Sequence, residues 1–260
     1  MKENNNLYLI ERQNRILNLL KERKRVTVKD LSNFFKISEV TVRNDLKELA
    51  RSGKIIRTHG GAIYLDNSET EGIYNYRKNQ NVAQKKKIAK LASTLINDGE
   101  VVFIDASTTA SHIIPYLYDK MELTVVTNSI EVAHTLAISS LINVLLIGGR
   151  LRREALSTTG YPVDYILKDI NLSKAFMGAS GFTLEEGLTD VNQEEINIKK
   201  SIVEKSKNTI AVVDSSKWGK VSFGTFADTK RINSFITDEK APNDIVKQLT
   251  KIGVQVLIAD

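Results

Sequence analysis

Two short amphipathic segments on either side of a tight turn lie between residues 27 and 51, and they restrict the fold more than any other feature. Thr27 and Ser38 stand just before the two segments, and hydroxyl side chains of this kind cap helix N-termini. Each segment carries one apolar stripe at helical spacing: Val28, Leu31 and Phe35 in the first, and Val42, Leu46 and Leu49 in the second. The pattern predicts two helices joined by a turn at Lys36 and Ile37.

A glycine pair between two β-favouring runs follows directly. Residues 54–58 and 62–64 favour strands, and Gly60-Gly61 between them predicts a hairpin turn. Gly53 is placed to end the preceding helix, because glycine adopts the left-handed conformation that closes a helix. The two helices and the hairpin together predict a winged helix-turn-helix domain over residues 1–64.

Charge supports a polyanion as the partner of this domain. Residues 1–65 hold 14 Lys and Arg against 7 Asp and Glu, whereas the remaining residues hold 23 against 24. A basic excess confined to a quarter of the chain favours double-stranded DNA as the ligand. The second helix offers Arg, Asn and Thr, which read base edges, and the hairpin tip offers phosphate contacts. The candidate DNA-binding residues are Thr27, Ser38, Glu39, Val40, Thr41, Arg43, Asn44, Lys47, Arg57, Thr58 and His59.

The rest of the chain predicts a linker and a larger domain. Residues 65–80 are polar and aperiodic, which is typical of a linker, and residues 81–260 are long enough for a second core. The chain has no cysteine, and its three histidines are scattered, so we expect neither a metal nor a cofactor. No apolar leader and no run of about 20 apolar residues is present, so we expect a soluble, cytoplasmic protein.

Apolar strand-like runs alternate with helical patterns throughout the second domain. The candidate strands are 101–104, 124–126, 144–147, 175–177, 209–213, 235–236 and 255–258, and the clearest helices are 87–96, 129–137 and 194–206. Such alternation predicts parallel βαβ units, and near-continuous apolar strands fit a sheet that is covered on both faces. The expected fold class is α/β, a mostly parallel sheet.

Small, hydroxylated or glycine-rich loops follow five of these strands. They are residues 105–109, 127–129, 148–150, 178–181 and 214–217. Ligands of open α/β sheets bind at the carboxyl edge of the strands, where hydroxyl and backbone N–H groups can hold an anion. One such loop alone is typical of a helix cap. Several on one edge, together with Lys217, favour an anion pocket that suits a phosphate.

Both domains resemble the DeoR family of bacterial transcriptional regulators. The first domain is similar in Arg12, in the run from Ser38 to Leu46 and in His59-Gly60-Gly61-Ala62, although many members have two arginines where this chain has Arg43-Asn44. The second domain is similar to the family's sensor domain in the loops given above and in Lys199 and 187–189. That sensor domain is similar in fold to ribose-5-phosphate isomerase.

The resemblance implies a repressor of a sugar-metabolism operon that leaves its operator when a phosphorylated sugar binds. Because one helix-turn-helix reads only a half-site, we also expect a homo-oligomer, a dimer or a tetramer. Transferred to this sequence, the effector-binding residues are Asp105, Ser107, Thr108, Thr109, Asn128, Ser129, Gly149, Gly178, Asp190 and Lys217. Ser107 stands where many members have glycine, so the phosphate would be held slightly differently.

Two other functions compete with this interpretation. The first is a sugar-phosphate isomerase with a DNA-binding appendage, but the sequence shows no paired-carboxylate or nucleophile–base pattern, and we expect no enzyme. The second is a DNA-binding protein whose larger domain only oligomerises. Arg150, Arg152 and Arg153 are expected in a solvated loop or a subunit contact. Residues 85–87 are three lysines, and we expect them on a solvated helix face. The family resemblance gives the alternative that Lys87 reaches toward the site.

Overall fold

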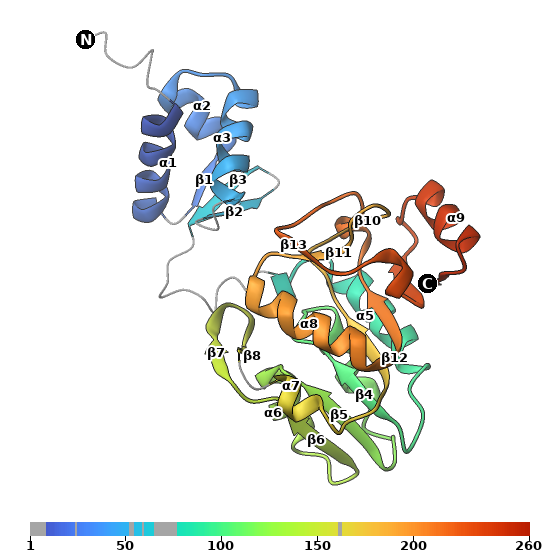
Figure 1. The fold of residues 1–260 in the computed structure, drawn as a ribbon. Helices are drawn as coiled ribbons and strands as arrows, with labels where there is room; N and C mark the ends of the chain where they lie inside the picture. Colours follow the sequence, from blue (N-terminus) through green and yellow to red (C-terminus); the bar gives the residue numbers. More distant parts are fainter. Residues whose placement is uncertain (1–8, 24, 52–54, 59, 65–76, 161–162) are drawn as a thin grey trace. The chain divides into compact units, whose positions relative to one another are not determined.

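The computed structural model describes residues 9–23, 25–51, 55–58, 60–64, 77–160 and 163–260. The chain divides into two compact units, Met1–Ile73 and Tyr74–Asp260, which are described separately here (Figure 1). Most of the predicted linker lies outside the described residues. None of the described helices is long and apolar enough to cross a membrane.

The described part of the first unit has three helices and a small antiparallel sheet. Its elements are α1 (Leu9–Arg23), β1 (Arg25–Thr27), α2 (Val28–Phe35), α3 (Glu39–Arg51), β2 (Ile55–Thr58) and β3 (Gly61–Tyr64). The strand order is β1-β3-β2, and both pairings are antiparallel. The predicted helices and hairpin are confirmed. Strand β1 was not predicted, because three residues are too few to show a period of two.

The sequence signals at the helix boundaries act as expected. The Thr27 side chain accepts a hydrogen bond from the backbone N–H of Asp30 at 3.0 Å, and Ser38 accepts one from Thr41 at 3.1 Å. Lys36 takes the left-handed conformation (φ 53°) that ends α2. The two predicted apolar stripes are buried in one core with residues of α1.

The second unit is built on a seven-stranded parallel sheet. The strands are β4 (Val101–Ile104), β5 (Leu123–Thr127), β6 (Ile142–Leu146), β9 (Leu172–Met177), β12 (Ser206–Val212), β14 (Ser234–Asp238) and β15 (Gln255–Ala259). Their order is β15-β14-β12-β9-β4-β5-β6, and every neighbouring pair is parallel. Each of the seven predicted strands is a member of this sheet.

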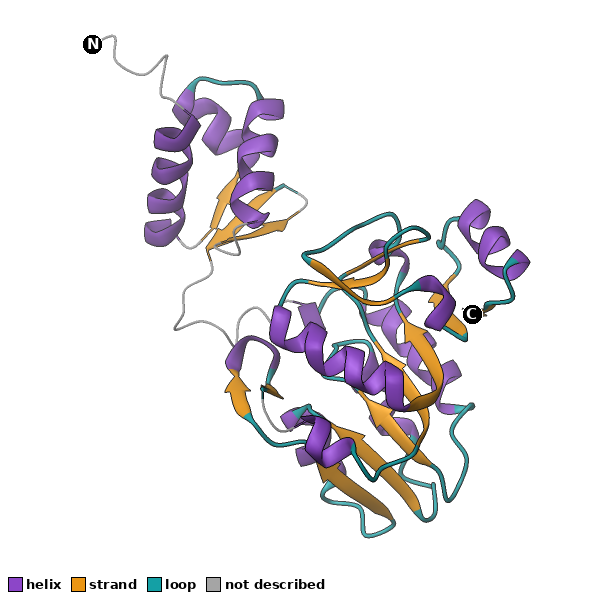
Figure 2. Ribbon diagram, viewed as in Figure 1, coloured by secondary structure: helices purple, strands orange, loops and turns teal. Residues whose placement is uncertain are grey.

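Helical elements cover both faces of the sheet (Figure 2). One layer holds α5 (Val82–Ser93), the 3-10 helix η1 (Ala110–Tyr116) and α6 (Ile130–Leu136), and the other holds α7 (Val163–Leu167), α8 (Gln193–Lys205) and α9 (Asn243–Lys251). Phe103 packs with the second layer, whereas its neighbours Val102 and Ile104 pack with the first. This alternation of side chains explains why the strands read as continuous apolar runs.

The strand order reverses between β4 and β9, and the site is found there. The chain builds β5 and β6 on one side of β4 and then returns to build β9, β12, β14 and β15 on the other. Ligands of open α/β sheets bind at such a switch point. Two small antiparallel sheets lie beyond the strand ends: β7 (Arg150–Arg152) with β8 (Ser157–Thr159), and β10 (Gly181–Thr183) with β11 (Gly187–Asp190) and β13 (Gly224–Ala227). Neither was predicted.

Candidate functional site

The exposed face of α3 carries the residue types that read DNA. The buried stripe turns the opposite face outward, so that five predicted contacts are exposed: Glu39, Val40, Arg43, Asn44 and Lys47. Val40 is 65% exposed, although it is apolar. A methyl-bearing side chain beside arginine and asparagine suits a major-groove surface, where thymine methyls are contacted.

Arg43 is held by a contact that DNA can replace. Its Nη2 lies 2.7 Å from Oε2 of Glu39, one helical turn earlier, and both side chains are about half exposed. An exposed ion pair of this kind stabilises a protein by less than about 1 kcal/mol. A bidentate bond to guanine is therefore strong enough to compete with Glu39 for Arg43.

A buried ion pair fixes α3 against α1. Asp45 is 2% exposed and accepts two hydrogen bonds from Arg12, at 2.6 Å from Nε and 3.0 Å from Nη2. The hydrogen bonds from Arg12 to this carboxylate raise the pKa of the Arg12 guanidinium. The pair sets the orientation of the reading helix. The sequence placed Arg12 and Asp45 in the family pattern but did not indicate that they pair.

The hairpin and the cap residues take their predicted places. Arg57 is exposed and Thr58 half-buried on β2, Thr41 and Thr27 are half-buried, Ser38 is exposed, and His59 lies outside the described residues. Gly61 is required by close packing, because a Cβ there would lie 1.9 Å from the carbonyl oxygen of Val26. Contacts of these residues with DNA stay predictions.

The second unit has a polar cavity at the switch point between β4 and β9. Its lining includes Arg77, the loop residues Ala106, Ser107, Thr108 and Thr109, then Arg152 and Ala155, the loop residues Gly178, Ala179 and Ser180, and Asp190, Glu195, Lys199 and Lys217. Elements far apart in sequence thus bring hydroxyls, carboxylates and cations to one place. The combination suits a ligand that is both anionic and rich in hydroxyl groups.

Asp105 holds two of the cavity loops together. This residue is 1% exposed, and it accepts hydrogen bonds from the backbone N–H groups of Ser107 (2.9 Å) and Gly178 (2.8 Å). Gly178 leaves no room for a side chain, because a Cβ there would lie 2.2 Å from the Ser107 hydroxyl oxygen. The geometry therefore makes Asp105 a residue that positions the loop, rather than one that faces the ligand.

Lys199 lies between two buried carboxylates. Its Nζ is 2.6 Å from Oδ2 of Asp190 and 3.2 Å from Oδ2 of Asp105. Burial alone would raise the pKa of Asp190, but the charge and hydrogen bond of Lys199 outweigh burial and lower it to about 2. Burial likewise opposes the charge of Lys199, but the surrounding carboxylates raise its pKa. Asp190 and Lys199 are therefore both ionised at neutral pH, and Ser180 donates a further hydrogen bond to Asp190 at 2.8 Å.

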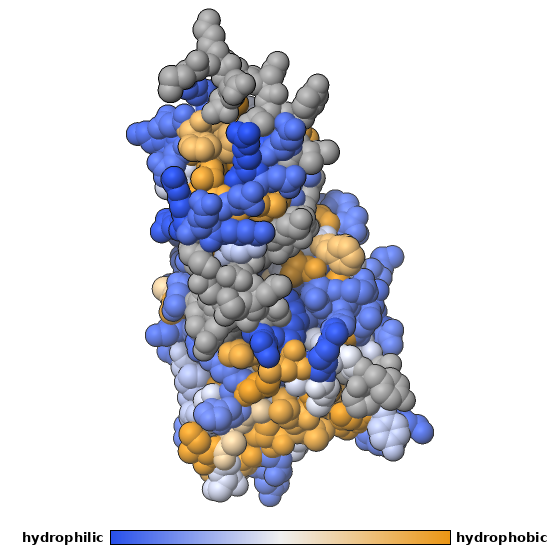
Figure 3. Space-filling view, turned by 90° about the vertical axis from the view of Figure 1, so that its left-hand side faces the viewer, coloured by the Kyte–Doolittle hydropathy of each residue, from blue (hydrophilic) through white to orange (hydrophobic). Residues whose placement is uncertain are grey.

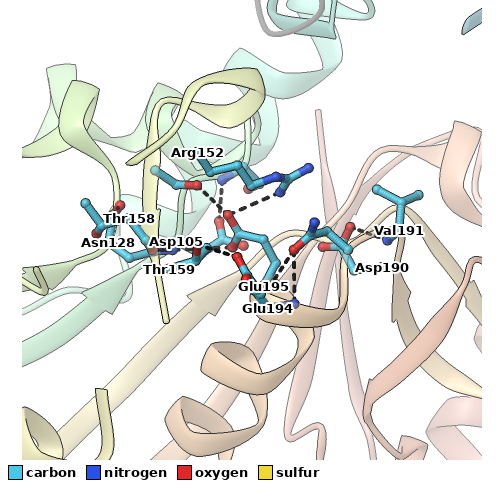
Figure 4. Close-up of polar contacts among 12 residues, drawn as sticks. Asp105, Asn128, Arg152, Thr158, Thr159, Asp190, Val191, Glu194 and Glu195 are labelled. Carbon is cyan, nitrogen blue, oxygen red and sulfur yellow. Dashed lines mark hydrogen bonds and ion pairs between the residues drawn. The ribbon is translucent and has the colours of Figure 1, made fainter. Parts of the chain in front are cut away.

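A second network surrounds Glu195 on α8 (Figure 4). Glu195 is buried, accepts hydrogen bonds from Ser157 and from Nδ2 of Asn128 (3.3 Å), and lies 3.3 Å from Nη1 of Arg152. Arg150, by contrast, is largely exposed and pairs with Glu194. The expectation of a solvated arginine loop is thus correct for Arg150, whereas Arg152 lines the cavity.

The cationic side of the cavity lies around Lys217. This residue ends the 3-10 helix η3 (Ser215–Lys217), and the Asp214 side chain caps that helix through the N–H of Ser216 at 3.0 Å. Burial lowers the pKa of Lys217, while the nearby Asp214 opposes that shift. A lysine whose charge is poorly solvated gains more from an incoming anion than an exposed one does.

Six of the ten predicted effector residues line the cavity: Ser107, Thr108, Thr109, Gly178, Asp190 and Lys217. The other four lie outside this lining. Asp105 and Asn128 are buried behind it, and Ser129 is fully buried, where its hydroxyl caps α6 by accepting from the N–H of Val132 at 3.2 Å. Gly149 has φ 142°, and a Cβ there would lie 2.4 Å from a backbone oxygen of Thr159.

Sequence reasoning left out four charged residues of the lining: Arg77, Arg152, Glu195 and Lys199. Glu195 and Lys199 stand four residues apart among the buried isoleucines of α8, so helical spacing placed both on the inward face. That signal was present in the sequence. Arg152 lies on the unpredicted strand β7, and Arg77 lies within the predicted linker, so no sequence pattern placed either residue at the cavity.

Comparison with known proteins agrees with this description of both units. Residues 12–68 match the DeoR-like helix-turn-helix domain, and residues 80–239 match the DeoR C terminal sensor domain. The HTH-type transcriptional regulator GolR of Listeria innocua is 34% identical over 98% of this chain and 100% of its own. The HTH-type transcriptional repressor GlcR of Bacillus subtilis is 34% identical over 98% of each chain. The glycerol-3-phosphate regulon repressor of Escherichia coli is 30% identical over 95% of this chain and 97% of its own.

Solved structures give more distant likenesses. Ribose 5-phosphate isomerase A from Methanocaldococcus jannaschii is 19% identical, with a TM-score of 0.40 over 54% of this chain and 55% of its own. The eIF2B delta structure from Chaetomium thermophilum is 13% identical, with a TM-score of 0.46 over 87% of each chain.

Proposed function

This chain belongs to the DeoR family of helix-turn-helix transcriptional regulators, and we propose that a phosphorylated sugar in the switch-point cavity releases it from its operator. It is a DNA-binding repressor of the kind that controls sugar operons, and its named relatives are regulators rather than enzymes. We place its action in the cytoplasm, where the operator DNA is.

The observation that carries the effector proposal is the division of charge within one cavity. Carboxylates of Asp190 and Glu195 lie in its lining, where they can accept hydrogen bonds from sugar hydroxyls. The lining also holds the loop hydroxyls of residues 107–109 and the ammonium of Lys217, which can donate to a phosphate. A sugar without phosphate would leave Lys217 poorly solvated, and an inorganic anion would leave the carboxylates unused.

The named repressors among the relatives support this class of ligand. One is the glycerol-3-phosphate regulon repressor, whose name contains a phosphorylated polyol. Another is a putative repressor of the aga operon from Escherichia coli, 32% identical over 95% of this chain. We infer a small phosphorylated sugar or polyol as the effector here.

A variant of Lys217 tests the cavity assignment. The change Lys217→Ala should leave operator binding intact, because the residue lies in the second unit, and should abolish release by the phosphorylated sugar. Lys220→Ala is the matched control, since Lys220 is exposed and is not part of the lining described above. Normal release from the Lys217 variant would contradict the phosphate assignment. Failure of every sugar phosphate to release the unmodified protein would favour a domain that only oligomerises.

We further propose that two copies bind one operator, because one helix-turn-helix contacts only a half-site. The edge strand β6 is the surface that suits a second copy. Residues 142–146 contain no charged side chain, and Leu145 and Leu146 are 37% and 39% exposed. Figure 3, which views the side where β6 and β7 lie, shows a broad apolar area on this unit.

An uncharged edge strand pairs with its own copy without repulsion between like charges. Sedimentation of the full chain and of Leu145→Lys tests this surface. The account predicts an oligomer that the lysine dissociates, and an unchanged oligomer would place the interface elsewhere.

A further inference from the structure

Lys85 is a buried lysine that no sequence argument placed at the site. It belongs to α5 and is 3% exposed, whereas its neighbours Lys86 and Lys87 are exposed. The structure thus corrects the expectation that Lys87 is the lysine of this run that reaches inward. Burying an ammonium opposes its charged form, so each contact that it makes there matters.

The Lys85 ammonium joins the cavity wall to the end of the linker. Its Nζ donates a hydrogen bond to Oγ1 of Thr108 at 3.0 Å, and Thr108 lines the cavity. It also donates to the backbone carbonyl of Arg77, the first described residue of the predicted linker. One side chain therefore contacts both the loop that we assign to the phosphate and the segment that leads to the DNA-binding unit.

Two further contacts attach the same segment to elements of the second unit. Lys78 forms an ion pair with Glu131, on the helix that follows β5. The Asn81 side chain donates a hydrogen bond to Oδ1 of Asp214 at 3.0 Å, in the loop that carries Lys217. Residues 77–81 are thus held by side chains of α5, of α6 and of the loop that follows β12. A displacement of any of these three elements would therefore act on the described end of the linker.

The charges around Lys85 make it sensitive to an anion. The negative charge of Asp214 acts on both Lys85 and Lys217, and it favours the charged form of each. Burial lowers the pKa of Lys85 to about 8, while Asp214 opposes that shift. Thr108 uses its oxygen as the acceptor for Lys85, so its O–H remains able to donate to a phosphate. A phosphate bound there polarises the hydroxyl and strengthens its bond to Lys85.

We propose that Lys85 is the positioning residue that couples an anion in the cavity to the linker. A phosphate dianion on the loop of residues 107–109 draws the ammonium toward Thr108 and weakens its hold on the Arg77 carbonyl. The segment 77–81 then changes its attachment, and the DNA-binding unit is affected through the chain between them. This inference rests on the proposed phosphate site and adds to it the route by which the site acts.

Hydrogen exchange of the full chain tests the coupling. The probe is inorganic phosphate, compared with chloride at equal ionic strength, and the peptides that matter cover residues 77–85 and 105–110. We expect phosphate to slow exchange in the 105–110 loop and to alter exchange in 77–85 by at least about twofold. In Lys85→Met the loop response should remain and the 77–85 response should disappear. Lys86→Met, an exposed neighbour, is the matched control.

The outcomes separate the coupling from the site itself. A protected loop with no change in residues 77–85 of the unmodified protein would overturn the coupling and leave the phosphate site standing. No response in either peptide, with phosphate or with sugar phosphates, would overturn both. Should Lys85→Met fail to fold, Glu131→Gln provides the second test, because Glu131 lies outside the cavity lining described above. Loss of the 77–85 response in that variant, with the loop response retained, supports the coupling, and an unaltered response contradicts it.

Discussion

Replacing Lys199 by methionine should destabilise the second unit more than any exposed substitution on α8. The change removes an ammonium that lies within 3.2 Å of both Asp105 and Asp190 and leaves these buried carboxylates without it. Methionine has a similar volume, so the loss comes mainly from charge. Removing one partner of a buried ion pair costs about 3–5 kcal/mol. For a domain of this size that corresponds to a Tm lower by roughly 6–20 °C.

The loss should also depend on pH in a defined direction. In the unmodified protein the pKa of Asp190 lies at about 2 instead of 3.8, so its ionised form stabilises the fold by about 2 kcal/mol. That contribution is complete above about pH 4 and is lost as the pH falls through 2. In Lys199→Met, burial raises the pKa of Asp190 with no ammonium to oppose it, so protonation of Asp190 reduces the destabilisation of the variant as the pH falls from 7 toward 4. The difference in unfolding free energy should shrink over that range.

Urea unfolding followed by tryptophan fluorescence measures this difference. Trp218, the single tryptophan, is 6% exposed and packs against Phe182 and Phe235, so its emission reports on the second unit. Lys200→Met is the control, because Lys200 is the exposed neighbour on the same helix. A Lys199 variant as stable as this control would refute the reasoning. A loss that is equal at pH 7 and pH 4 would refute the electrostatic cause.

Three further predictions concern the two sites. Asn44→Ala should cost roughly 1–3 kcal/mol at one operator base pair in anisotropy titrations, and a uniform loss on all DNA sequences would make the residue a phosphate contact instead. Gly178→Ala should abolish the effector response without loss of operator binding, because the new Cβ would lie 2.2 Å from the Ser107 hydroxyl oxygen. Gly148→Ala is the control, because a Cβ at Gly148 would meet open space. A normal effector response of the Gly178 variant would contradict the loop geometry. Asp45→Asn should lower the unfolding free energy of the first unit by about 3 kcal/mol in circular dichroism melts, because the Arg12 guanidinium loses this carboxylate. An unchanged melt would show that the ion pair of Arg12 and Asp45 does not stabilise the unit.

The architecture of both units was accessible from the sequence because its determinants are local and periodic. The caps Thr27 and Ser38 and the stripes behind them fix α2 and α3. The apolar runs of the larger unit are long enough to identify all seven strands of the parallel sheet. Strands of three residues, such as β1 and β10, were not predicted, because tertiary pairing rather than propensity holds them.

The site was predictable where it follows strand ends and unpredictable where it depends on long-range contact. The loop of residues 107–109 and Lys217 are placed by the parallel sheet, whose carboxyl edge gathers whatever follows each strand. The ion pair of Arg12 with Asp45 joins residues 33 positions apart, and no periodicity reports such a pairing. In the lysine run, spacing alone did not show that Lys85 rather than Lys87 faces inward.

The account is tested most directly by the anisotropy of labelled DNA from upstream of the gene, titrated with the full chain at fixed salt. A panel of sugar phosphates is then added, each beside its unphosphorylated sugar. The account predicts that one phosphorylated compound releases the DNA and that its unphosphorylated counterpart does not. Release by both forms alike, or operator binding that no compound shifts, would contradict it.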